Sequence, residues 1–108
     1  MTDQPNTPFA CNMDACNPRQ RERHGELSRV LRGSAARVEE LADGYQFHLP
    51  ADAELYVQVA EWVTLERLCC PFFDFALTWP HDDGIRLSVT GEDGVKAFAA
   101  EEFGLVPA

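Results

Sequence analysis

Two stretches of alternating apolar and polar residues, each followed by a helical pattern, constrain the fold of this chain most. In the first stretch, strands over 37–41 and 45–49 flank an Asp43-Gly44 turn. In the second, strands over 73–79 and 85–89 flank a turn that ends in glycine. Alternation with a period of two is typical of hairpins that bury one face. We therefore expect two ββα units that form a four-stranded antiparallel sheet with helices on one face.

Capping residues and prolines predict where the helices begin and end. Asn17-Pro18 indicates the start of an N-terminal helix, because asparagine caps helices and proline fits their first turn. This helix should end at Gly33. A second helix over 53–69 is stopped by Pro71, and a third is expected over 91–103. The predicted fold is α+β: an N-terminal helix followed by the two ββα units.

Length and charge limit the domain organisation and the partners. A chain of 108 residues supports one domain, which we expect over 17–104 after a flexible, cysteine-containing lead over 1–16. The formal charge of −9 argues against a nucleic-acid partner. No apolar run approaches the roughly 20 residues of a membrane span, and no signal-peptide pattern opens the chain. We expect a cytoplasmic protein.

Glu66 occupies the most unusual position in the pattern. At about 100° per residue it falls in the centre of the apolar stripe of the second helix, beside Leu55 and Val59. A buried carboxylate must be paired, protonated or bound to a cation. Cys69 and Cys70 follow at i+3 and i+4, on the same turn. We expect one thiol–carboxylate cluster at the end of this helix.

Two further cysteines precede the first helix. Residues 1–32 carry five basic and four acidic groups, whereas 33–108 carry four basic and fourteen acidic groups. This asymmetry predicts that the basic first helix docks on the acidic body. The lead would then place Cys11 or Cys16 over the cluster. Thiolates with a carboxylate suit Zn(II), Cu(I), Hg(II) or arsenite rather than Mg(II) or Ca(II).

The leading hypothesis is therefore a soft-metal-binding protein, with no organic cofactor indicated. Its candidate metal ligands are Cys69, Cys70, Glu66, Cys11 and Cys16.

Two other functions stay open. In a thiol enzyme, Glu66 would move a proton while Cys69 or Cys70 attacks a disulfide, a peroxide or an organometallic substrate. In an interaction module the cysteines would be inert, and the exposed side of the sheet could form a homodimer. A low thiol pKa in the absence of metal would favour the enzyme.

The remaining cysteine and histidine chemistry is expected to be ordinary. A structural disulfide is the least expected role, because the chain can bury a core without one and a disulfide between adjacent cysteines is strained. His24, His48 and His81 have no ligand spacing to the cysteines, so we expect surface or edge histidines. Trp79 is assigned to the core.

Several segments together resemble one protein family. These are Arg21-Glu22-Arg23-His24, Leu41-Ala42-Asp43-Gly44-Tyr45 and Glu66-Arg67-Leu68-Cys69-Cys70-Pro71-Phe72. The chain resembles a family of small uncharacterised bacterial proteins whose hallmark is Glu-x-x-Cys-Cys-Pro-Phe, often with a cysteine before the first helix. The resemblance covers about residues 11–103. It implies Cys11, Glu66, Cys69 and Cys70 as the shared polar set, with Cys16 as an extra, and it brings no settled activity.

Overall fold

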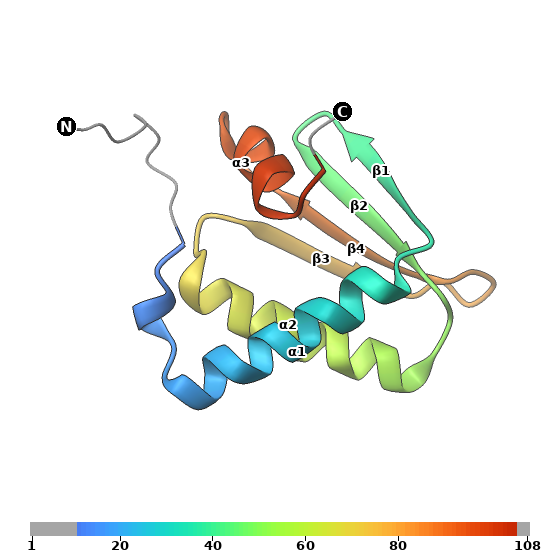
Figure 1. The fold of residues 1–108 in the computed structure, drawn as a ribbon. Helices are drawn as coiled ribbons and strands as arrows, with labels where there is room; N and C mark the ends of the chain where they lie inside the picture. Colours follow the sequence, from blue (N-terminus) through green and yellow to red (C-terminus); the bar gives the residue numbers. More distant parts are fainter. Residues whose placement is uncertain (1–10, 106–108) are drawn as a thin grey trace.

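The computed structural model describes residues 11–105, and Figure 1 shows how their elements are arranged. These residues form a short 3-10 helix, three α-helices and four strands. Along the chain these are η1 (Met13–Ala15), α1 (Pro18–Ser34), β1 (Arg37–Leu41), β2 (Gly44–Leu49), α2 (Ala53–Cys69), β3 (Asp74–Thr78), β4 (Ile85–Thr90) and α3 (Val95–Glu102). The predicted order of a helix and two ββα units is confirmed.

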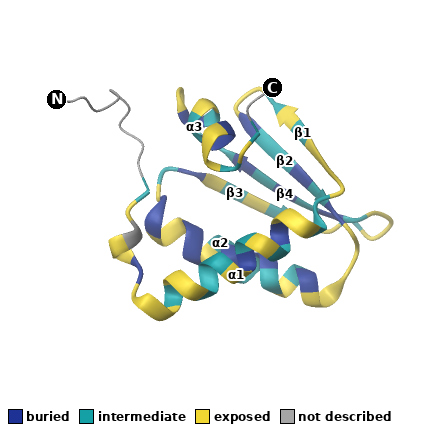
Figure 2. Cartoon of the chain, in the orientation of Figure 1, coloured by how far each residue is buried: buried dark blue, intermediate teal, exposed yellow. Residues whose placement is uncertain are grey.

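The four strands form one antiparallel sheet in the order β1-β2-β4-β3. Phe47 of β2 pairs with Leu87 of β4, which in turn pairs with Leu77 of β3. These apolar side chains share the face that the helices cover, and Figure 2 shows the buried residues gathered between the two layers. The α+β fold with helices on one face is therefore confirmed.

Side-chain caps fix the N-terminal starts of α1 and α2 as the sequence predicts. The Asn17 side chain accepts a hydrogen bond from the Gln20 N–H, and the Gln20 side chain accepts one from the Asn17 N–H. This reciprocal pair satisfies two N–H groups that the first turn leaves free. The Asp52 carboxylate caps α2 by accepting hydrogen bonds from the Glu54 and Leu55 N–H groups, and that helix ends at Cys69 as expected.

The structure corrects three local predictions. The first helix continues past Gly33 to Ser34, because the Ala35 N–H still bonds to the Leu31 carbonyl. The third helix begins at Val95 rather than 91, since the preceding residues form a turn whose Gly91 N–H donates to the Asp43 carbonyl. Trp79 is 41% exposed and lies against Tyr56 at the edge of the core.

The basic first helix does dock on the acidic body. The Arg23 guanidinium donates two hydrogen bonds of 3.0 Å to the Glu61 carboxylate of α2. Trp62 Nε1 donates to Ser28 Oγ at 3.0 Å, which joins the same two helices deeper in the layer. Because the first pair is half exposed, we attribute the docking mainly to the apolar residues Leu27 and Leu31.

No helix within residues 11–105 is long and apolar enough to cross a membrane. The first ten residues of the predicted flexible lead lie outside the described part of the chain.

Candidate metal centre

The carboxyl end of α2 buries a carboxylate and two sulfur atoms together. Glu66 is 1% exposed, Cys69 is 1% exposed and Cys70 is fully buried. The two sulfur atoms lie 3.6 Å apart, and Cys69 Sγ lies 3.5 Å from the Glu66 carbonyl oxygen. The helical periodicity thus correctly predicts that Glu66, Cys69 and Cys70 meet on one buried turn.

The lead before α1 crosses this end of α2. The Asn12 N–H donates to the Cys69 carbonyl at 2.8 Å, so the helix carbonyl is satisfied by the lead. The neighbouring Cys11 forms a disulfide with Cys70, and their Cα atoms lie 4.7 Å apart. The expectation that a disulfide is the least probable role is wrong. That expectation weighed an adjacent-cysteine bond and overlooked that the docked lead brings a third cysteine within bonding range.

His24 of α1 completes the buried cluster. Its Nε2 lies 2.6 Å from Glu66 Oε1, in a hydrogen-bonded pair with 15% of the His24 side chain and 1% of the Glu66 side chain exposed. The other oxygen, Glu66 Oε2, is buried and has no hydrogen-bond partner among the described residues. The expected surface or edge position of His24 is therefore wrong, because the docking of α1 on α2, and not sequence spacing, brings the ring here.

The other two histidines lie elsewhere. His48 pairs with Glu39 at 2.9 Å on the face of the sheet that carries no helix. His81 is exposed in the turn between β3 and β4.

Donor atoms at this end of the molecule form three overlapping groups in which all atoms lie within 4.8 Å of one another. These groups are Cys11, Cys69 and Cys70; Cys11, Glu66, Cys70 and Glu102; and His24, Glu66 and Cys69. Four of the five predicted ligands are thus brought together. Cys16, the fifth, is a buried free thiol and belongs to none of the three groups. The sequence reasoning missed Glu102, since α3 shares no spacing with the cysteines.

Burial and like charge control the electrostatics of the cluster. Loss of hydration, and then the nearby Glu66 carboxylate, raise the pKa of the Cys69 thiol to about 12. The same two causes raise the pKa of Glu102. A cation among these groups would offset both effects, because it stabilises the ionised forms that burial and repulsion disfavour.

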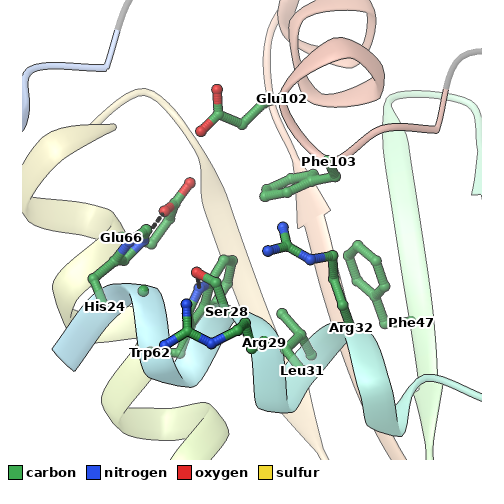
Figure 3. Close-up of a pocket in the computed structure, with 11 residues that line it drawn as sticks. His24, Ser28, Arg29, Leu31, Arg32, Phe47, Trp62, Glu66, Glu102 and Phe103 are labelled. Carbon is green, nitrogen blue, oxygen red and sulfur yellow. Dashed lines mark hydrogen bonds and ion pairs between the residues drawn. The ribbon is translucent and has the colours of Figure 1, made fainter. Parts of the chain in front are cut away.

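A pocket of about 260 Å³ opens beside the cluster, between α1, α2 and α3 (Figure 3). Glu66 forms part of its wall, so the pocket meets the thiol–carboxylate cluster at this residue. The other lining residues are His24, Gly25, Ser28, Arg29, Leu31, Arg32, Phe47, Trp62, Glu102 and Phe103.

Comparison of the chain with protein-family models, with curated proteins and with solved structures found no match. The Glu-x-x-Cys-Cys-Pro-Phe resemblance therefore stays a prediction.

Proposed function

We propose that this protein binds one soft metal ion through Cys11, Cys69 and Cys70 when the disulfide is reduced. The single observation that supports the proposal most is the placement of these three sulfur atoms within 4.8 Å of one another. Three thiolates form a donor set that suits Zn(II), Cu(I) or Hg(II).

The spacing of the sulfur atoms supports the same donor set. Two thiolates bound to zinc at about 2.3 Å in tetrahedral geometry lie about 3.8 Å apart. The Cys69 and Cys70 sulfur atoms, at 3.6 Å, are already near that separation. Glu66 and His24 adjoin the sulfur atoms, and either can supply a fourth ligand or orient the site.

The Cys11–Cys70 disulfide makes the proposed binding dependent on redox state. While it is intact, two of the three sulfur atoms are bonded to each other. A thiol reductant supplies two electrons, and two protons convert the disulfide into two thiols. Metal binding then displaces the thiol protons, so affinity should rise with pH.

The alternatives receive less support. A thiol enzyme needs a thiolate at neutral pH, whereas the pKa of the Cys69 thiol is raised to about 12. An inert interaction module gives no reason to bury Glu66 with an Oε2 that has no partner among the described residues, since such burial costs stability.

The test is a titration of reduced protein with Cd(II) under anaerobic conditions, followed by sulfur-to-metal charge-transfer absorption and native mass spectrometry. We expect one ion per chain, and a loss of affinity of at least about tenfold in Cys11→Ser, Cys69→Ser and Cys70→Ser. Oxidised protein should bind at least about tenfold more weakly than reduced protein.

Cys16→Ser is the matched control, because Cys16 is as buried as Cys69 but lies outside the three donor groups. Its affinity for Cd(II) should equal that of the parent. Equal binding by oxidised and reduced protein, or an equal loss in Cys16→Ser, would overturn the proposal. Circular dichroism of each variant separates a lost ligand from a lost fold.

A further inference from the structure

Acidic and basic side chains both line the pocket beside the cluster. Figure 3 shows Glu66 and Glu102 at the upper left of the space and Arg32 across from them, whereas the Arg29 side chain turns back along α1 toward Gly25. Along the axis of α1, the Cα atom of Arg32 lies about 12 Å beyond that of His24, which pairs with Glu66. A ligand that matches this pocket needs opposite charges at its two ends.

The basic side offers unused donors. Neither Arg29 nor Arg32 has an ion-pair or hydrogen-bond partner within residues 11–105. Ser28 Oγ accepts from Trp62 Nε1, which leaves the hydroxyl proton available for donation. Planar guanidinium groups beside a hydroxyl bind carboxylates through paired hydrogen bonds.

On the acidic side, His24 pairs with Glu66 through Oε1. Glu66 Oε2 is buried and has no hydrogen-bond donor among residues 11–105, and an oxygen of Glu102 lies within 4.8 Å of a Glu66 oxygen. Two carboxylates at this separation repel each other, and the pKa of Glu102 is raised accordingly after the effect of lost hydration. An ammonium group here would give Oε2 a donor and would reduce the repulsion.

Between the two sides the walls are aromatic. The Phe103 ring lies 5.8 Å from the Phe47 ring and 6.0 Å from the Trp62 ring. Such walls suit an apolar chain or ring. The volume of about 260 Å³ is below the roughly 300–1,000 Å³ of pockets that take drug-sized ligands, so the ligand is small.

We propose that this pocket binds a small amino carboxylate whose two charged groups are separated by an apolar chain. The carboxylate contacts Arg32, Arg29 and Ser28. The ammonium contacts Glu66 and Glu102, and the chain lies against the aromatic walls. This site does not depend on the proposed metal binding, although Glu66 belongs to both.

The fluorescence of Trp62 reports on the pocket. Trp79, the other tryptophan of the chain, contacts Tyr56 outside the pocket, so Trp79→Phe leaves Trp62 as the only emitter. The probes are 6-aminohexanoate, hexanoate and hexylamine, which share one chain and differ in their charged ends. We expect saturable binding of 6-aminohexanoate, and binding about ten- to a hundredfold weaker for the other two.

Two exposed substitutions test the basic side without disturbing the core. Arg29→Gln and Arg32→Gln should each weaken 6-aminohexanoate at least about fivefold, and the double variant should abolish binding. Hexanoate that binds as tightly as 6-aminohexanoate, unchanged binding in the double variant, or no saturable binding of any probe would overturn the proposal.

Loss of metal binding and loss of probe binding are expected in different variants. Arg29→Gln/Arg32→Gln should keep the Cd(II) affinity of the parent while losing 6-aminohexanoate. Cys69→Ser should show the reverse pattern. Loss of both activities in the arginine double variant, with the fold intact by circular dichroism, would show that the pocket is part of the metal site and would contradict a separate organic ligand.

Discussion

The molecule contains two histidine–glutamate pairs of similar geometry in different surroundings. His24 and Glu66 lie 2.6 Å apart between α1 and α2, with 1% of the Glu66 side chain exposed. His48 and Glu39 lie 2.9 Å apart on the face of the sheet without helices, with 42% of the Glu39 side chain exposed. The helical layer and the open face of the sheet thus each hold a histidine–glutamate pair, the first buried and the second exposed to solvent.

The difference shows that surroundings rather than residue type make one pair a candidate site. Glu39 receives hydrogen bonds from His48 and Gln46 and meets water beyond them. Hydrogen bonding from His48, the main cause, holds the pKa of Glu39 below its usual value. Glu66 instead has one buried oxygen with no donor in the described part of the chain, and it lies beside sulfur atoms and a pocket. Only the second arrangement gains from binding a cation.

The largest contrast should appear in thiol reactivity. In metal-free protein, iodoacetamide should alkylate Cys69 about a thousandfold more slowly at pH 8 than an exposed thiol introduced by Ala76→Cys on the open face of the sheet. A pKa near 12 leaves that much less thiolate than the usual value of about 8.5. Peptide mapping by mass spectrometry measures both rates in one protein.

A Cys69 rate within about tenfold of that at position 76 would contradict this expectation. It would also revive the thiol-enzyme hypothesis, because such a thiol would be reactive without metal.

The next contrast concerns stability. His24→Leu/Glu66→Met replaces both members of the buried pair by apolar chains of similar volume, and we expect the free energy of unfolding to rise by about 1–3 kcal/mol, because no polar group is left there without a partner. Glu39→Met should bring no such gain, because Glu39 is solvated and bonded. Urea unfolding of both variants at neutral pH measures the difference.

A loss of stability in His24→Leu/Glu66→Met would mean that the hydrogen bond between the two side chains outweighs the cost of the unpaired oxygen. The cluster would then be structural, and the unpaired Glu66 oxygen would carry no net cost in stability.

Local patterns suffice to predict the elements and half of the candidate site. Alternation and capping residues predict the four strands and the bounds of α2, because hairpins and caps depend on neighbours in sequence. Periodicity also predicts that Glu66 shares a buried turn with Cys69 and Cys70, since all three lie on one helix.

The rest of the site depends on how separate elements dock. His24 reaches Glu66 only because α1 packs across α2, and no spacing rule joins residues 42 positions apart. Cys11 reaches Cys70 across 59 positions for the same reason. Charge asymmetry correctly indicates that the helices dock but does not specify the rotation of α1, which decides whether His24 faces solvent or the core. Glu102 lies on a third element and gives no local signal.

The smallest expected effect is the pH dependence of the stability that the His48–Glu39 pair contributes. Because the pKa of Glu39 is lowered in the folded protein, the pair contributes stability above the ordinary glutamate pKa and loses it as the pH falls through the lowered value. Glu39→Gln should therefore be less stable than the parent near neutral pH, and the free energies of unfolding of the two proteins should converge as the pH falls from about 6 to about 3.

Two other carboxylates with lowered pKa values do not affect this difference, because both proteins contain them. They are Glu61, whose pKa is lowered by Arg23, and Asp83, whose pKa is lowered by the Gly84 N–H. Urea unfolding across this range measures the convergence. A difference that stays constant with pH would show that the pair contributes a neutral hydrogen bond and no ionic stabilisation, which would widen the contrast with the buried pair.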